Sequence, residues 1–130
     1  MAMISVTPIY AAILALMLVL LSVRTLLLRR RLAVSIGDGG KAVLARAVRV
    51  HGNFVEYVPL TLLLLFFLEV SLDNAVVIHV LGMLLITGRI SHAYGVSRIN
   101  EDFRFRVAGI ALTFTAMISA SLGLLMAVVA

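Results

Sequence analysis

Four polar side chains recur at helical spacing directly before one of the most apolar runs of this chain. Their separations of three, four and three residues place all of them on one face of a helix. We call this set the polar quartet: Arg46, Arg49, Asn53 and Glu56. Leu60 and Leu63 continue the same face into the run LTLLLLFFL, whereas His51 and Tyr57 point away from it.

The quartet offers two guanidinium groups, an amide and a carboxylate in a row. Arginine binds carboxylates through paired hydrogen bonds, a glutamate accepts from an ammonium group, and an amide bonds to a peptide group. A small zwitterionic peptide with two carboxylates and an amine matches this set, and glutathione is such a molecule. Glutathione would also bring a thiol, which this chain lacks because it contains no cysteine.

A purely structural role for the quartet is the alternative. A charged side chain near the hydrocarbon of a membrane must face the bundle interior, a partner or a water-filled cavity. Arg49 and Glu56 could then pair with each other across two turns, or with groups on other helices. Under either interpretation the quartet is expected to face inwards.

The composition is that of a membrane protein. Hydrophobic residues make up 63% and charged residues 13% of the 130 residues, and the mean hydropathy is +1.18. Soluble proteins contain about 45–50% apolar and about 25% charged residues. The apolar runs are continuous rather than alternating, which favours helices over the strands of a barrel. We therefore predict an all-α membrane protein, a four-transmembrane-helix bundle that forms one domain over residues 1–130.

Four membrane spans are expected, and the second contains the quartet. Their predicted ranges are 4–28, 41–68, 74–94 and 103–129. The charge-free part of the second span covers only residues 57–68, whereas a membrane requires about 20 residues of helix. Because KAVLARAVRVHGN contains no proline and is rich in good helix formers, we expect this helix to extend back through the quartet. SIGDGGKA before it is a turn signal without the spacing of a phosphate-binding loop.

The charges predict the orientation of the chain in the membrane. All eleven basic residues lie in or beside the first and third connections, whereas the second connection holds only Glu69 and Asp73. The positive-inside rule places the basic connections in the cytoplasm and both termini outside. The net charge of +5 is therefore attributed to topology, and no nucleic-acid partner is expected.

The segment RVHGNFVEYVP resembles the signature of the MAPEG family, the membrane-associated proteins of eicosanoid and glutathione metabolism. In that family the second helix carries an arginine, an asparagine four residues later, then Glu-Tyr and a proline. The likeness continues in GRISHAYG and DFRFRVAG, and GDGGKAVLARAVRVHGNFVEY resembles small bacterial members without a firmly assigned substrate. The residues that match the second-helix signature are Arg49, Asn53, Glu56, Tyr57 and Pro59.

The resemblance implies a homotrimer that binds glutathione, as cosubstrate, between subunits near the cytoplasmic face. Arg49, Asn53, Glu56 and Tyr57 would contact the tripeptide, with Arg46 from the same face. An arginine at the start of the fourth helix of the neighbouring subunit would stabilise the thiolate. Arg106 is the better candidate for this catalytic role and Arg104 the second, while a plain topology charge is the alternative for Arg106.

The third helix departs from the family pattern at its end. Eicosanoid-processing members have tyrosines here, whereas this chain has His92 and Tyr94, followed by Val96 where a second tyrosine would fall. A proton-donating tyrosine for hydroperoxide or epoxide substrates is therefore in doubt. Tyr94, which we count among the candidate glutathione-site residues, or His92 could substitute for it, and the alternative for both is a place at the membrane interface. Arg89 could bind a glutathione carboxylate or anchor its helix. His79, in mid-span, is expected to be packed and hydrogen-bonded, since it has no partners for a metal site.

We predict a bacterial inner-membrane glutathione transferase that joins the glutathione thiolate to lipophilic electrophiles. Peroxidase activity is an option within this prediction. The alternative is a non-catalytic membrane protein that binds glutathione or lipid. A small multidrug transporter is disfavoured, because that class needs a membrane-embedded carboxylate in the first span and residues 1–23 contain none.

Overall fold

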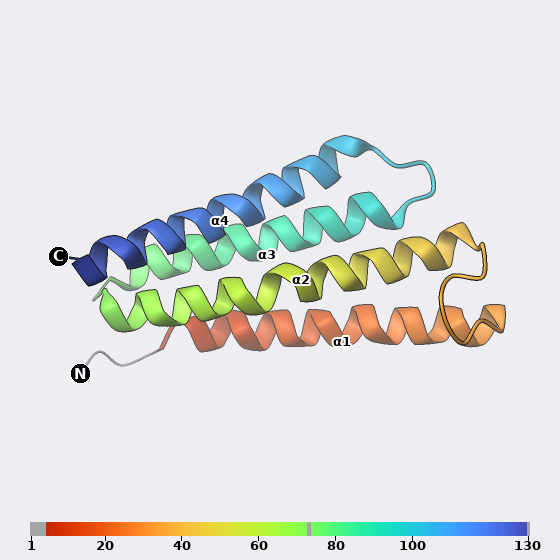
Figure 1. The fold of residues 1–130 in the computed structure, drawn as a ribbon, viewed down its shortest axis with the longest axis horizontal. Coiled ribbons are helices and arrows are strands. Elements are labelled where there is room, and N and C mark those ends of the chain that lie inside the picture. Colours follow the sequence, from red (N-terminus) through yellow and green to blue (C-terminus); the bar gives the residue numbers. More distant parts are fainter. Residues whose placement is uncertain (1–4, 73, 130) are drawn as a thin grey trace.

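The computed structural model describes residues 5–72 and 74–129 and consists of four long helices. They are α1 (Thr7–Leu32), α2 (Ala42–Ser71), α3 (Ala75–Ser97) and α4 (Phe103–Val129). Figure 1 shows an up-and-down bundle in which the start of α1 and the end of α4 lie at one end. The α1–α2 and α3–α4 connections lie together at the other end.

Each of the four helices is long and apolar enough to cross a membrane. The prediction of an all-α protein with four helices suited to span a membrane is therefore confirmed. The first three helices end three or four residues later than predicted, and the fourth has the predicted bounds. Ile4, the predicted start of the first span, lies outside the described residues.

The predicted extension of α2 through the quartet is also confirmed. This helix has 30 residues and continues through Pro59 without a break. At 1.5 Å per residue it is about 45 Å long, compared with about 30 Å for the hydrocarbon core of a bilayer. One end of α2 must therefore extend beyond the hydrocarbon, and the end with the arginines is the polar one.

Two glycines allow α3 and α4 to approach each other closely. A Cβ atom on Gly88 would lie 2.9 Å from the carbonyl oxygen of Gly109, and one on Gly109 would lie 2.5 Å from the amide nitrogen of His92. Small residues at such contacts let membrane helices pack backbone to backbone. This approach brings Arg89 on α3 into hydrogen-bond distance of Thr113 on α4.

Two polar contacts join α1 to its neighbours in the half of the bundle away from the quartet. The carboxylate of Glu69, near the end of α2, accepts hydrogen bonds from the backbone N–H groups of Ser5, Val6 and Thr7 at 2.8, 2.7 and 2.8 Å. This caps the N-terminus of α1, where a negative charge also interacts favourably with the helix dipole. The hydroxyl of Tyr10 lies 2.9 Å from Nδ1 of His79. The hydrogen bond expected of His79 is present, although the residue is exposed rather than packed.

We predict that Glu69→Ala destabilises the bundle, because three N–H groups at the start of α1 lose their acceptor. The expected loss is about 2 kcal/mol, measured as a lower midpoint of thermal unfolding in detergent. Glu69→Gln is the control, since it keeps one acceptor oxygen and should lose less. Identical midpoints for the wild type and the alanine variant would rule out this capping role.

Candidate functional site

The structure divides the polar quartet into two pairs. Asn53 is buried and Arg46 is partly buried, and both are hydrogen-bonded to other parts of the chain. The side chains of Arg49 and Glu56 are 58% and 49% exposed, and they form an ion pair with each other at 3.2 Å. The pairing of Arg49 with Glu56 that the structural alternative predicts is therefore present, whereas the prediction that these two residues face inwards is wrong within a single chain.

The helical spacing explains this division. At about 100° per residue, Arg46 and Asn53 lie nearly in line along α2, and Arg49 and Glu56 lie nearly in line about 60° away. One line faces α3 and its connection to α4, and the other lies on the surface of the bundle. Leu60 and Leu63, which continue the quartet along the helix, are exposed as well. The quartet thus extends from the interior to the surface.

Asn53 belongs to a buried cluster around Arg89. The Oδ1 atom of Asn53 accepts a hydrogen bond from Nη1 of Arg89 at 2.7 Å, and Thr113 accepts another from Nε at 3.0 Å. The guanidinium carbon of Arg89 also lies 5.8 Å from the ring centroid of Tyr57, which permits a cation–π interaction. Arg89 therefore anchors α3 to both α2 and α4, one of the two roles predicted for it.

The Arg89 cluster leaves polar atoms without partners. Among the described residues, no hydrogen-bond partner is found for Nη2 of Arg89 or for the two ring nitrogens of His92, and all of these atoms are buried. A buried polar group without a partner is costly. Both residues lie on α3, one turn apart, and the protein encloses these atoms.

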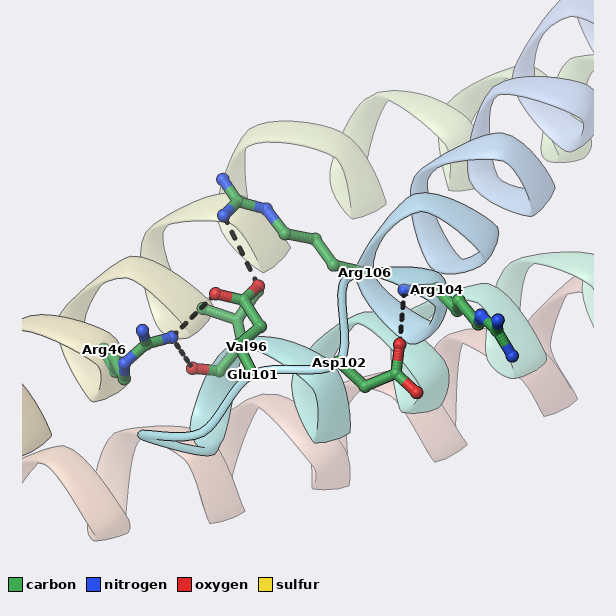
Figure 2. A network of polar contacts seen from close by, with 6 residues as sticks. All are labelled: Arg46, Val96, Glu101, Asp102, Arg104 and Arg106. Carbon is green, nitrogen blue, oxygen red and sulfur yellow. Dashed lines mark hydrogen bonds and ion pairs between the residues drawn. The ribbon is translucent and has the colours of Figure 1, made fainter.

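A second polar group forms around Glu101 in the connection between α3 and α4 (Figure 2). Arg46 donates from Nη1 to Oε2 of Glu101 at 2.9 Å and to the carbonyl oxygen of Val96 at 3.0 Å. Arg106, on the first turns of α4, lies 3.4 Å from the other carboxylate oxygen. The hydrogen bond from Arg46 lowers the pKa of Glu101 below its ordinary value, and the charge of Arg106 adds to this effect.

Arg104 and Tyr94 are placed differently from Arg106. Figure 2 shows the Arg104 side chain directed away from the Glu101 group, and its backbone N–H donates to Asp102 at 3.0 Å. Tyr94 is exposed, and its hydroxyl accepts a hydrogen bond from Arg98 at 2.6 Å. Of the two arginines predicted for the thiolate, only Arg106 is linked to the quartet through described contacts.

His51 lies off the quartet, as predicted. The same prediction is wrong for Tyr57, which contacts Arg89 on the side of Asn53. The Nε2 atom of His51 is 3.0 Å from the Oγ atom of Ser22 on α1. The same hydroxyl also donates to the carbonyl oxygen of Leu18 at 2.9 Å, so the imidazole N–H is the donor in the contact with His51. His51 therefore joins α2 to α1.

Sequence reasoning missed Glu101 and Thr113. Glu101 could have been noticed as an acidic residue within a strongly basic connection, INEDFRFR. Thr113 gave no signal, because its role depends on how α3 and α4 are aligned along each other. Within residues 5–72 and 74–129, no three His, Asp or Glu side chains come close enough together to hold a metal ion.

We predict that Asn53→Ala destabilises the protein even without any ligand, because the buried guanidinium of Arg89 loses its shortest hydrogen bond. Hydrogen bonds to charged groups contribute about 1.5–3 kcal/mol, so a loss of about 2 kcal/mol is expected in thermal unfolding. Asn100→Ala, in an exposed connection, is the matched control and should leave the midpoint unchanged. Equal midpoints for both variants would mean that the Arg89 cluster contributes no stability.

The comparisons with known proteins agree with this architecture. The family model described as "MAPEG family" matches residues 7–126. The inner membrane protein YecN of Escherichia coli (strain K12) is 36% identical over 113 residues, which cover 87% of this chain and 85% of the relative. YecN of Escherichia coli O6:H1 matches to the same extent. Because the family model spans almost all of the described helices, this chain belongs to the MAPEG family.

Proposed function

We propose that this protein is a membrane-bound glutathione transferase of the bacterial inner membrane, with its site between the subunits of a homotrimer near the cytoplasmic face. The quartet, together with Tyr57 and Arg89, would hold the tripeptide, and Arg106 would stabilise the thiolate. The termini would lie outside. The observation that carries the proposal is the Arg49–Glu56 ion pair, which is exposed on α2. It lies on the same helix face as the other two members of the quartet, which are less exposed and hydrogen-bonded to other parts of the chain.

The depth of Glu56 in the membrane requires that its exposed side chain be covered. Glu56 lies 15 residues before Ser71, the last residue of α2, which corresponds to about 22 Å along the helix axis. That distance is within a hydrocarbon core of about 30 Å. A charged pair facing lipid at this depth is unfavourable. A second copy of the chain, with a polar ligand between the two, would remove the Arg49–Glu56 pair from lipid.

The chemistry of the quartet suits the parts of glutathione. Arg49 would bind a carboxylate, and Glu56 would bind the ammonium group. Arg46 would bind a carboxylate through the N–H groups that its bonds to Glu101 and Val96 leave free. The Oδ1 atom of Asn53 already accepts from Arg89, so the amide NH₂ of Asn53 is left to donate to a peptide carbonyl.

The reaction requires a cation near the sulfur atom. A free thiol with a pKa of about 8.5 is only a few per cent thiolate at pH 7. Lowering this pKa by about two units requires about 2.7 kcal/mol of differential interaction, which one poorly hydrated guanidinium can supply. The thiol proton leaves to water, the thiolate attacks an electrophilic carbon to form a C–S bond, and the leaving group departs with its electron pair. The electrophile would reach the site through the bilayer.

A non-catalytic protein that binds glutathione or lipid is the second candidate function. The observation that favours it is the pairing of Arg106 with Glu101, because a cation that already has a counter-ion stabilises a thiolate less well. Peroxidase activity has less support than conjugation, since the Tyr94 hydroxyl is exposed and bonded to Arg98. The name of the YecN relatives specifies no activity.

We predict that millimolar glutathione raises the thermal unfolding midpoint of the detergent-purified protein. At ten times the dissociation constant the stabilisation would be about 1.4 kcal/mol. Arg49→Ala and Glu56→Ala should lose this shift, whereas Arg31→Ala, which removes one cytoplasmic charge from α1, should keep it. A wild-type midpoint that glutathione does not move would refute the binding site.

We further predict that Arg106→Ala still binds glutathione but no longer lowers the pKa of its thiol. The measurement is the ultraviolet absorbance of the bound thiolate as a function of pH, together with conjugation of a generic aryl halide. Arg104→Ala is the matched control on the same helix and should behave as the wild type. Binding without conjugation in the wild type would select the non-catalytic function.

A further inference from the structure

Glu101 occupies an unusual place for an acidic residue of a surface connection. Its side chain is only 7% exposed, and its two carboxylate oxygens face two different arginines. Arg46 comes from α2 and Arg106 from α4, while Glu101 itself lies between α3 and α4 (Figure 2). Three elements of the bundle therefore meet at one carboxylate.

The two contacts of Glu101 are not equivalent. Arg46 is 2.9 Å away, is less exposed, and has a second acceptor in the carbonyl oxygen of Val96. Arg106 is 3.4 Å away, and its side chain is 43% exposed. A long and exposed ion pair contributes little stability, whereas the doubly bonded Arg46 fixes the carboxylate in place. Arg106 can therefore exchange its partner without disturbing the rest of the group.

From this geometry we propose that Glu101 is the resting counter-ion of Arg106, and that an incoming thiolate must displace it. The inference rests on the proposed function, because it assigns the regulation of the same site. Glu101 is a positioning residue rather than a catalytic one, since it acts only through Arg106. Arg46 provides the fixed point that keeps the carboxylate near Arg106 after the exchange.

This arrangement has a physical consequence for the strength of thiolate binding. Two anions near one guanidinium repel each other, so Glu101 raises the thiol pKa above the value that Arg106 alone would give. Weakly binding anions from the cytoplasm must also compete with the Glu101 carboxylate for binding to Arg106. A thiolate delivered by a peptide bound to the quartet has an advantage over them, because its position is fixed by other contacts.

The first test is a pH titration of the bound glutathione thiolate in the wild type and in Glu101→Gln, which keeps an acceptor for Arg46 but carries no charge. We expect the thiol pKa to be lower in the variant by about 0.5 to 1 unit, or about three- to tenfold more thiolate at a pH below it. Asp38→Asn, in the exposed α1–α2 connection, removes the same charge elsewhere and should match the wild type. A thiol pKa in Glu101→Gln that is unchanged or higher overturns the inference and leaves the proposed function standing.

The second test needs neither glutathione nor a Glu101 variant. The chain has only three glutamates, so carboxyl-labelled glutamate allows the titration of Glu101 to be followed by NMR. Arg106→Gln removes the cation, so Glu101 should titrate at a higher pH than in the wild type. If the wild type forms no thiolate, the proposed function fails, and this titration still decides the counter-ion role. If Glu101 titrates at the same pH in the wild type and in Arg106→Gln, the counter-ion role is overturned. This second test remains decisive even if the Glu101→Gln variant does not fold.

Discussion

The helix α2 is longer than the hydrocarbon core of a membrane is thick, and the polar contacts of its arginine-rich half follow from this mismatch. Its first half must carry charges at the boundary between hydrocarbon and water, where an unpaired charge is costly. The chain satisfies them with a different neighbour at each turn. Arg46 contacts the α3–α4 connection, Asn53 contacts Arg89 on α3, and His51 contacts α1. Only the Arg49–Glu56 pair has no neighbour outside its own helix in the described contacts.

The four apolar helices and the extension of α2 could be predicted because they depend on properties of the linear sequence. Apolar length, helix propensity and the position of arginines determine where a helix enters and leaves a membrane. The division of the quartet could not be predicted in the same way. Its spacing defines an arc about 80° wide, but which edge of that arc is buried depends on where α3 and α4 pack. The residues that share this face of α2 could therefore be listed from the sequence, whereas the direction of two of them could not be predicted.

The two ends of the bundle use their charges in different ways. At one end, Glu69 accepts three short hydrogen bonds from backbone N–H groups at and just before the start of α1, so this carboxylate is bonded to the main chain. At the other end, Glu101 contacts two side chains, one of them at 3.4 Å. A backbone-bonded carboxylate maintains the fold, whereas the carboxylate of Glu101 is bonded to side chains, and one of them, Arg106, can change its partner. The location of the proposed site at the second end agrees with that difference.

Arg89 connects the proposed site to the packing of the whole bundle. It is almost fully buried, and its hydrogen bonds join Asn53 on α2 to Thr113 on α4. The close approach at Gly88 and Gly109 fixes the distance between α3 and α4 at the same level. A ligand that binds the amide of Asn53 would therefore act on a side chain whose orientation is already determined by two other helices. Such preorganisation reduces the conformational entropy that binding must remove, which makes a site built on three packed helices suitable for a small and flexible peptide.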